Sequence, residues 1–217
     1  MSRAIDFSLY LITDEEIARD PDRVRLALAA LPRGFAAVQL RAKSLSARAL
    51  LSAATVLRAI TREAGAALYV NDRADVALAA SADGVHLPSH GLSPETVRAF
   101  APALAIGVST HDRGEVDRAI AGGADFVTFG PVYATPSKAT LGEPVGVAAL
   151  ASAVGGTAVS FPIFALGGID AARAHECRKA GARIACIRAI LGAPDPAAAA
   201  RAFLTLPRHR ASQTADD

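Results

Sequence analysis

Short apolar segments alternate with longer segments of mixed polarity along the whole chain. The short segments are almost continuously apolar, a pattern that is typical of strands covered on both faces. They lie at residues 9–12, 37–40, 67–70, 84–87, 105–108, 126–129, 162–166 and 184–187. The longer segments carry apolar residues at helical spacing, as in residues 47–63. The pattern therefore predicts eight strands that alternate with helices.

This regular alternation predicts an α/β protein built as a single (β/α)8 barrel, the TIM barrel. The alternative is an open doubly wound sheet, which usually has about five or six strands and a G-x-G-x-x-G motif after the first one. Here Thr13-Asp14-Glu15 follow the first strand instead, so the barrel is favoured. We expect the barrel to span residues 1–206 and a polar, disordered tail to span residues 207–217.

Composition narrows the class of protein. The chain has 217 residues, of which 52% are hydrophobic, and a formal net charge of +2. This excludes a disordered chain, and no apolar run approaches the ~20 residues of a membrane span. A near-neutral charge argues against a nucleic-acid partner, and Cys177 and Cys186 form no disulfide framework or metal-ligand pattern. We therefore expect a cytoplasmic protein without a membrane partner; a homo-oligomer remains open.

The chain uses Arg for most of its positive charge and has only three lysines, Lys43, Lys138 and Lys179. A lysine that persists in such a chain is a candidate for a role that needs a compact ammonium group. Lys179 lies on a predicted helix, and we interpret it as surface charge. Lys43 and Lys138 follow predicted strands, where they are candidates for chemistry.

Barrels of this kind carry their sites at the carboxyl ends of the strands. Gln39, Arg41 and Lys43 alternate at the end of the second strand and suit a phosphate group, with a chance surface pair as the alternative. Asn71 and Asp72 end the third strand and offer an amide and a hard oxygen ligand. Asp72 also fits the N-cap of the following helix.

The later strands add hydroxyl, imidazole and backbone groups. Ser109 and His111 end the fifth strand; His111 is a candidate general acid or base, or a structural cap. The long loop after the sixth strand carries Thr135, Ser137 and Lys138. Gly167-Gly168 and Ile187-Arg188 follow the last two strands, where barrels commonly bind phosphate. Two cationic regions, around Lys43 and Arg188, predict two phosphorylated ligands or one long ligand.

Seven motifs in register resemble those of the thiamine phosphate synthase and TenI superfamily. They are Tyr10-Leu11-Ile12-Thr13-Asp14, Gln39-Leu40-Arg41-Ala42-Lys43, Asn71-Asp72-Arg73, Gly84-Val85-His86-Leu87, Ile106-Gly107-Val108-Ser109-Thr110-His111, Gly130-Pro131-Val132 with Thr135-Pro136-Ser137-Lys138, and Gly167-Gly168-Ile169. The resemblance covers residues 9–195. It implies a synthase that joins hydroxymethylpyrimidine pyrophosphate to thiazole phosphate, with Mg²⁺ assisting the departure of pyrophosphate.

The resemblance also implies roles for individual residues, and Asp72 would be a Mg²⁺ ligand. The pyrimidine pyrophosphate would be held by Gln39, Arg41, Lys43, Asn71, Ser109 and Lys138. The thiazole phosphate would be held by Thr135, Pro136, Ser137, Gly168, Ile187 and Arg188. Among these, Arg41, Lys43 and Lys138 would act directly on the departing pyrophosphate.

The chain departs from the synthase pattern at three places. The synthase usually continues after His-Leu with Gly-Gln-Glu-Asp, whose Asp is a second Mg²⁺ ligand, whereas Pro88-Ser89-His90-Gly91 stand here. Arg188 stands where Ser is usual, and Ser137 where Thr is usual. Mg²⁺ remains an expected cofactor because it is often bound through one or two carboxylates with phosphates and water.

Three interpretations follow. The synthase is favoured because all its pyrophosphate-binding residues are present. The second is a thiazole tautomerase of the TenI type, in which His111 would move the proton and no Mg²⁺ is needed. The third is a regulator that binds the same ligands without turning them over.

Overall fold

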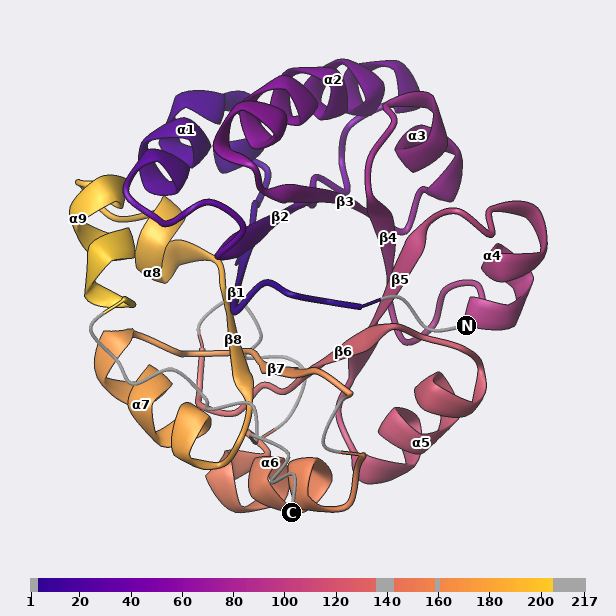
Figure 1. Ribbon diagram of the computed structural model, residues 1–217, viewed down its shortest axis with the longest axis vertical. Helices are drawn as coiled ribbons and strands as arrows, with labels where there is room; N and C mark the ends of the chain where they lie inside the picture. The colour runs from indigo at the N-terminus through magenta and orange to yellow at the C-terminus, as the bar shows by residue number, and fades with distance from the viewer. Residues whose placement is uncertain (1–3, 136–142, 159–160, 205–217) are drawn as a thin grey trace, which may run out of the picture.

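The computed structural model describes residues 4–135, 143–158 and 161–204. Eight parallel strands form a closed barrel in sequence order, and β8 pairs with β1 to complete it (Figure 1). The strands are β1 (Leu9–Ile12), β2 (Ala36–Leu40), β3 (Ala67–Asn71), β4 (Gly84–Leu87), β5 (Ala105–Thr110), β6 (Phe126–Phe129), β7 (Ile163–Ala165) and β8 (Arg183–Cys186). The predicted (β/α)8 barrel is confirmed.

Helices form a ring outside the strands (Figure 1). They are η1 (Ile17–Arg19), α1 (Pro21–Ala29), α2 (Ala47–Ala64), α3 (Ala74–Ala79), α4 (Pro94–Phe100), α5 (Arg113–Ala121), α6 (Gly146–Gly155), α7 (Ala171–Lys179), α8 (Arg188–Leu191) and α9 (Pro196–Ala202). Helix α2 shows why the sequence forms them: Ser46 accepts the Ala49 N–H at its start, and Gly65 ends it with a φ of 67°. No helix in the described ranges is long and apolar enough to cross a membrane.

Each strand buries both of its faces, which explains the continuous apolar runs. Leu9 and Leu11 pack outward in the cluster that includes the helices, whereas Tyr10 and Ile12 pack in the smaller cluster inside the barrel. All four side chains of β1 are buried. A parallel sheet covered on both faces has no solvent-exposed face to carry polar residues.

The barrel interior is filled by aromatic rings that need small neighbours. A Cβ on Gly84 would lie 2.3 Å from Tyr69 Cε1, and a Cβ on Gly107 would lie 2.4 Å from Phe126 Cζ. Tyr69 and Phe126 are themselves in contact, with ring centroids 5.3 Å apart. Glycines in β4 and β5 thus make room for large side chains from β3 and β6.

The segment before β1 crosses the amino-terminal end of the barrel (Figure 1). Phe7 stacks on Phe164 with a centroid separation of 5.0 Å and also contacts the rings of Tyr10, Tyr69 and Phe126. The Arg183 guanidinium donates to the carbonyl oxygens of Ile5 and Phe7. The floor of the barrel is therefore closed, and ligands have access at the opposite end.

Strands β1, β4 and β6 have the predicted limits, and the limits of the other five strands differ from the prediction by one or two residues. The largest difference is in β5, which extends to Thr110 because Ser109 and Thr110 still pair with β6 and the Thr110 hydroxyl donates to the Thr128 carbonyl. Ser109 therefore lies within a strand at the mouth of the barrel rather than in the following loop. The expected tail over residues 207–217 lies outside the described residues and stays a prediction.

Candidate active site

A cavity of about 290 Å³ lies at the mouth of the barrel between the segments that follow β2, β3 and β4. Lys43, Asn71, Asp72, Arg73 and His90 contribute its polar lining. Two of the motifs that the sequence placed at strand ends thus meet around one space. The cavity holds both signs of charge, as a site for a phosphate group and a cation requires.

Side chains between β1 and α1 form hydrogen bonds with the segment that carries Arg41 and Lys43. Thr13 Oγ1 accepts the Arg41 N–H at 2.9 Å, and Glu15 accepts the N–H and the hydroxyl of Ser44 at 2.9 and 2.7 Å. These hydrogen bonds from Ser44 lower the pKa of the Glu15 carboxyl group. Residues 41–44 are therefore fixed at both ends by β1–α1 side chains.

Arg41 and Lys43 form no ion pair with any carboxylate in the described ranges. By contrast, Arg58 forms two hydrogen bonds with Asp83, at 2.7 and 3.1 Å. A cation without a neighbouring carboxylate keeps its charge available for an anionic ligand. The mouth of the barrel is therefore prepared for an anionic ligand.

Asp72 has a strained backbone. Its φ is 65°, and the Arg73 N–H donates to Asn71 O at 2.7 Å across it in a tight turn. The Asp72 N–H donates to His86 O at 2.8 Å, which fixes the turn to β4. Strained residues of this kind gather at functional sites. The N-cap of α3 is Arg73 without a side-chain cap, so the expectation that Asp72 caps this helix is wrong.

The place of the missing second carboxylate lies beside Asp72. A Cβ on Gly91 would lie 3.1 Å from Asp72 Oδ1. No group of three or more His, Cys, Asp or Glu side chains in the described part of the chain is arranged to hold a metal ion. Asp72, with the amide oxygen of Asn71 nearby, fits Mg²⁺ only when substrate phosphates and water supply the other ligands.

A row of buried, hydrogen-bonded side chains lies at the base of the barrel mouth. Gln39 Nε2 donates to Tyr10 Oη at 3.1 Å, and Tyr10 Oη lies 3.4 Å from His86 Nδ1. His86 Nε2 lies 3.0 Å from Ser109 Oγ. These hydrogen bonds connect Gln39 of β2 to Ser109 of β5 through Tyr10 and the buried His86 of β4. Burial raises the pKa of Tyr10, which stays a neutral phenol.

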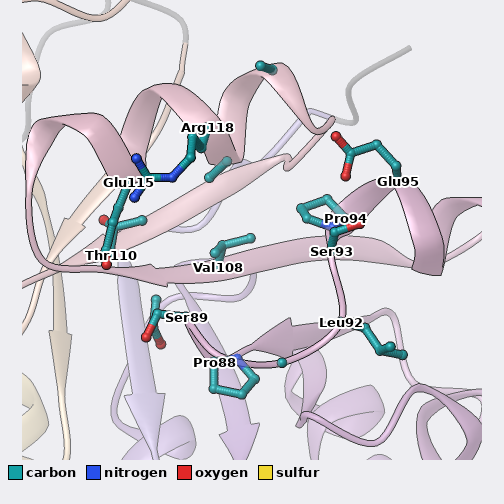
Figure 2. Close-up of a pocket in the computed structure, with 14 residues that line it drawn as sticks. Pro88, Ser89, Leu92, Ser93, Pro94, Glu95, Val108, Thr110, Glu115 and Arg118 are labelled. Carbon is teal, nitrogen blue, oxygen red and sulfur yellow. The ribbon is translucent and has the colours of Figure 1, made fainter.

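A second cavity of about 450 Å³ lies between the segment after β4 and helix α5. Figure 2 shows Pro88 and Ser89 on one side of it and Glu115 and Arg118 on the other. Pro88 lines both cavities, and Ser109 lines the second one. The segment after β4 therefore separates the space around Asp72 from the space around Ser109.

His111 is paired with a carboxylate. Its Nδ1 lies 2.9 Å from Glu115 Oε2, and its backbone N–H donates to the same oxygen at 2.7 Å. Asp112 caps helix α5 by accepting the Glu115 N–H at 2.8 Å. The expectation that His111 caps this helix is therefore wrong, because Asp112 is the cap. The contact of His111 with Glu115 fixes the ring and leaves Nε2 for proton transfer.

The Gly167-Gly168 turn packs against the segment that leaves β6. A Cβ on Gly168, whose φ is 61°, would lie 2.6 Å from Ala134 O. The glycine is thus required by the neighbouring chain, a reason that the sequence did not reveal. Thr135 directly follows Ala134 and is partly buried. Pro136, Ser137 and Lys138 lie outside the described residues, and their roles stay predictions.

The end of β8 carries the last two predicted residues. Ile187 precedes α8, and Arg188 is its first residue. The Arg188 side chain is 69% exposed and forms an ion pair with Asp14, which follows β1. The guanidinium thus lies along the rim of the mouth.

Neither cysteine takes part in this site. Burial raises the pKa of the Cys177 thiol to about 11 and that of Cys186 to about 12. Both thiols are therefore protonated near neutral pH and poor nucleophiles. Both cysteines are free and buried.

Comparison with known proteins agrees with the geometry. The thiamine monophosphate synthase family profile matches residues 9–190. A protein of Geobacter sulfurreducens is 50% identical over 210 residues, which cover 95% of this chain and 98% of that protein. The thiamine-phosphate synthase of Methanoculleus marisnigri is 45% identical over 199 residues, covering 91% of this chain and 93% of its own.

A solved structure has the same fold. The thiamine phosphate pyrophosphorylase of Pyrococcus furiosus superposes with a TM-score of 0.83 at 33% sequence identity. The superposition covers 93% of this chain and 95% of that protein. The profile, the relatives and this structure lead to the same conclusion: the chain belongs to the thiamine monophosphate synthase family.

Proposed function

We propose that the protein joins hydroxymethylpyrimidine pyrophosphate to thiazole phosphate and releases thiamine phosphate and pyrophosphate. The observation that supports this proposal is that Lys43, which forms no ion pair within the described ranges, lines the same cavity as Asp72 at the barrel mouth. Named thiamine-phosphate synthases among the relatives support it. Both substrates are small and phosphorylated, in keeping with the two cationic regions and with a cytoplasmic location.

Departure of pyrophosphate is the step that this mouth serves best. The bond between the pyrimidine methylene carbon and the pyrophosphate oxygen breaks, and negative charge builds on the oxygen. Arg41, Lys43 and Lys138 would stabilise that charge, and the Asn71 amide would orient the group. The thiazole nitrogen then forms its bond to the methylene carbon, whose positive charge the pyrimidine ring delocalises.

Asp72 would hold Mg²⁺ together with the substrate's pyrophosphate oxygens. Mg²⁺ bound there would supply further positive charge to the leaving group. The strained turn at Asp72 keeps this carboxylate at the mouth, in the cavity that Lys43 also lines. Gln39 and Ser109 would contact the pyrimidine end from the floor of the site.

The thiazole phosphate would bind at the other cationic region. Gly168, Ile187 and Arg188 contribute backbone and guanidinium groups from the ends of β7 and β8. Thr135 lies on the segment that packs over Gly168, and Pro136 and Ser137 follow it in the sequence. The two substrates would therefore approach from opposite sides of the mouth.

An assay with both purified substrates, with and without Mg²⁺, tests the proposal. We expect thiamine phosphate and pyrophosphate in equal amounts, with the rate rising with Mg²⁺. Failure to form thiamine phosphate at any Mg²⁺ concentration would overturn it.

The pairing of His111 with Glu115 supports thiazole tautomerisation as a second candidate activity. An imidazole oriented by a carboxylate is suited to moving a proton between carbon atoms. Isomerisation of the thiazole phosphate alone, without Mg²⁺, would identify that activity. Binding of both ligands without any product would identify the regulator.

A further inference from the structure

Three side chains from two segments form a compact cluster beside Gly168, where the thiazole phosphate is proposed to bind. Tyr133, in the segment after β6, donates its hydroxyl to Glu176 Oε2 at 2.7 Å. The Arg173 guanidinium carbon lies 4.9 Å from the centroid of the Tyr133 ring. Arg173 and Glu176 both belong to α7. The ring is thus held by a hydrogen bond at its tip and a cation–π contact on its face.

The cluster also fixes the Gly167-Gly168 turn. Arg173 Nη1 donates to Gly168 O at 2.8 Å, and the Tyr133 N–H donates to Gly167 O at 3.1 Å. A Cβ on Gly168 would lie 2.9 Å from Tyr133 Cβ, so the turn and the tyrosine are in direct contact. The segment after β6 and the Gly167-Gly168 turn are therefore held together by the same cluster of side chains.

The anchored turn presents backbone donors. Holding Gly168 O fixes the plane of the peptide that also carries the Ile169 N–H. Within the described ranges, the N–H groups of Gly168 and Ile169 donate to no acceptor, although Ile169 is only 5% exposed. Successive unpaired N–H groups of this kind bind anions.

We propose that Tyr133, Arg173 and Glu176 are positioning residues that hold Thr135 and the Gly168 turn in place for the phosphate of the thiazole substrate. The inference rests on the proposed function, because it takes that phosphate as the ligand. The three residues contact the turn and the segment after β6, and they act on the substrate through these groups. A phosphate bound by backbone and hydroxyl donors depends on their placement to a fraction of an ångström.

Tyr133 is suited to this role over the whole working range of pH. Burial and the hydrogen bond to Glu176 both raise the pKa of its phenol, which stays a donor. Glu176 needs only an acceptor oxygen for this contact, so an amide should replace its carboxylate. Removing either partner breaks the same hydrogen bond.

The test measures steady-state kinetics of thiamine phosphate formation for Tyr133→Phe, Glu176→Ala, Glu176→Gln and the double variant Tyr133→Phe/Glu176→Ala. We expect the first two to raise KM for thiazole phosphate about three- to tenfold, the range for one hydrogen bond. KM for the pyrimidine pyrophosphate stays unchanged. Glu176→Gln behaves like the wild type, and the double variant is no worse than either single variant.

Glu63→Ala is the matched control, because it removes an exposed carboxylate that pairs with Arg25 on the outer helices. It should leave both KM values unchanged. Calorimetric titration of each folded variant with thiazole phosphate alone gives a second readout. Equal increases in both KM values, or unchanged thiazole phosphate binding in Tyr133→Phe and Glu176→Ala, would overturn the inference.

The same measurements separate this inference from the proposed function. A wild type that binds thiazole phosphate but forms no thiamine phosphate contradicts the synthase alone, and the titrations then decide the positioning role. A wild type that does not bind thiazole phosphate overturns both.

Discussion

Arg188 Nε lies 3.3 Å from Asp14 Oδ2, so an ion pair joins the ends of β8 and β1 at the seam where the barrel closes. Asp14 also accepts the N–H groups of Glu16 and Ile17 at the start of η1. Partial burial raises the pKa of the Asp14 carboxyl, but the contacts with Ile17 and Arg188 outweigh this effect and lower it. The carboxylate therefore holds the guanidinium at the rim of the mouth, next to the site proposed for the thiazole phosphate.

Arg188→Ser should weaken binding of thiazole phosphate by about 1.5 kcal/mol, roughly tenfold in Kd, because a charged hydrogen bond to the phosphate is lost. Little change in stability is expected, since the Arg188 side chain is 69% exposed and Asp14 keeps its hydrogen bonds from Glu16 and Ile17. Calorimetric titration with thiazole phosphate measures the effect. Tighter binding after the substitution would mean that Arg188 obstructs the site.

In the proposed synthase reaction, Lys43→Ala should lower kcat roughly 10²-fold, because it removes a cation that would stabilise the departing pyrophosphate. Lys179→Ala is the control, since Lys179 lies at the exposed end of α7. Single-turnover rates of thiamine phosphate formation provide the measurement. Equal activity in the two variants would show that Lys43 has no part in the reaction.

Gly91→Asp should raise Mg²⁺ affinity about tenfold by placing a second carboxylate near Asp72. The new Cβ would be crowded, at 3.0 Å from Pro88 Cδ, so Gly91→Ala controls for this contact. Asp72→Asn should abolish the Mg²⁺ dependence. Titration with Mg²⁺ in the presence of inorganic pyrophosphate reports the affinities, and identical curves for all four proteins would place the metal elsewhere.

His111→Ala separates the two enzymatic candidates. In a synthase it should cost little, because charge and metal drive the departure of pyrophosphate. In a tautomerase it should cost about 10²–10⁴-fold, the usual range for a general acid or base. Glu115→Gln should reproduce part of that loss. Rates of both reactions are compared, and a large loss confined to thiazole isomerisation would favour the tautomerase.

Glu15→Gln should destabilise the protein at neutral pH but not in acid. The folded protein lowers the pKa of Glu15 below its ordinary value near 4.5, so its stabilising effect is complete above that value and is lost as the pH falls through the folded pKa. The difference in free energy of unfolding between wild type and variant should therefore be constant above the ordinary value and shrink as the pH falls below it, through the lowered pKa of folded Glu15. Urea denaturation from pH 3 to 8 measures it.

Glu16→Gln is the control for that series, because it neutralises the adjacent exposed carboxylate without touching Ser44. Its effect should be small and independent of pH. A Glu15→Gln difference that persists unchanged at pH 3 would show that the charge of Glu15 plays no part.

The strands could be predicted because each of them buries both faces, which leaves a local signature. The positions of Arg41, Lys43, Asn71 and Asp72 followed from the rule that barrel sites lie at the carboxyl ends of strands. Of these, Lys43, Asn71 and Asp72 line one cavity, which could be expected because β2 and β3 are neighbours.

Contacts between loops could not be predicted in this way. Glu15 bonds to Ser44, and Arg173 to Gly168, only because the barrel brings their segments together. The sequence marked Gly168 as special, but the residue that requires a glycine there, Ala134, became visible only in three dimensions. The sequence shows Tyr133 after β6 but does not show that it contacts Arg173 and Glu176 of α7.

The contact of Arg183 with Ile5 and Phe7 has a consequence for how the chain folds during its synthesis. The floor of the barrel is synthesised first, but the side chain that fastens it is 176 residues further along the chain from Phe7. During translation, the Phe7 carbonyl therefore lacks its hydrogen bond from Arg183 until β8 has left the ribosome. Barrel closure is a late event governed by the slow meeting of distant segments, and a chain truncated before β8 would display its aromatic floor to chaperones and proteases.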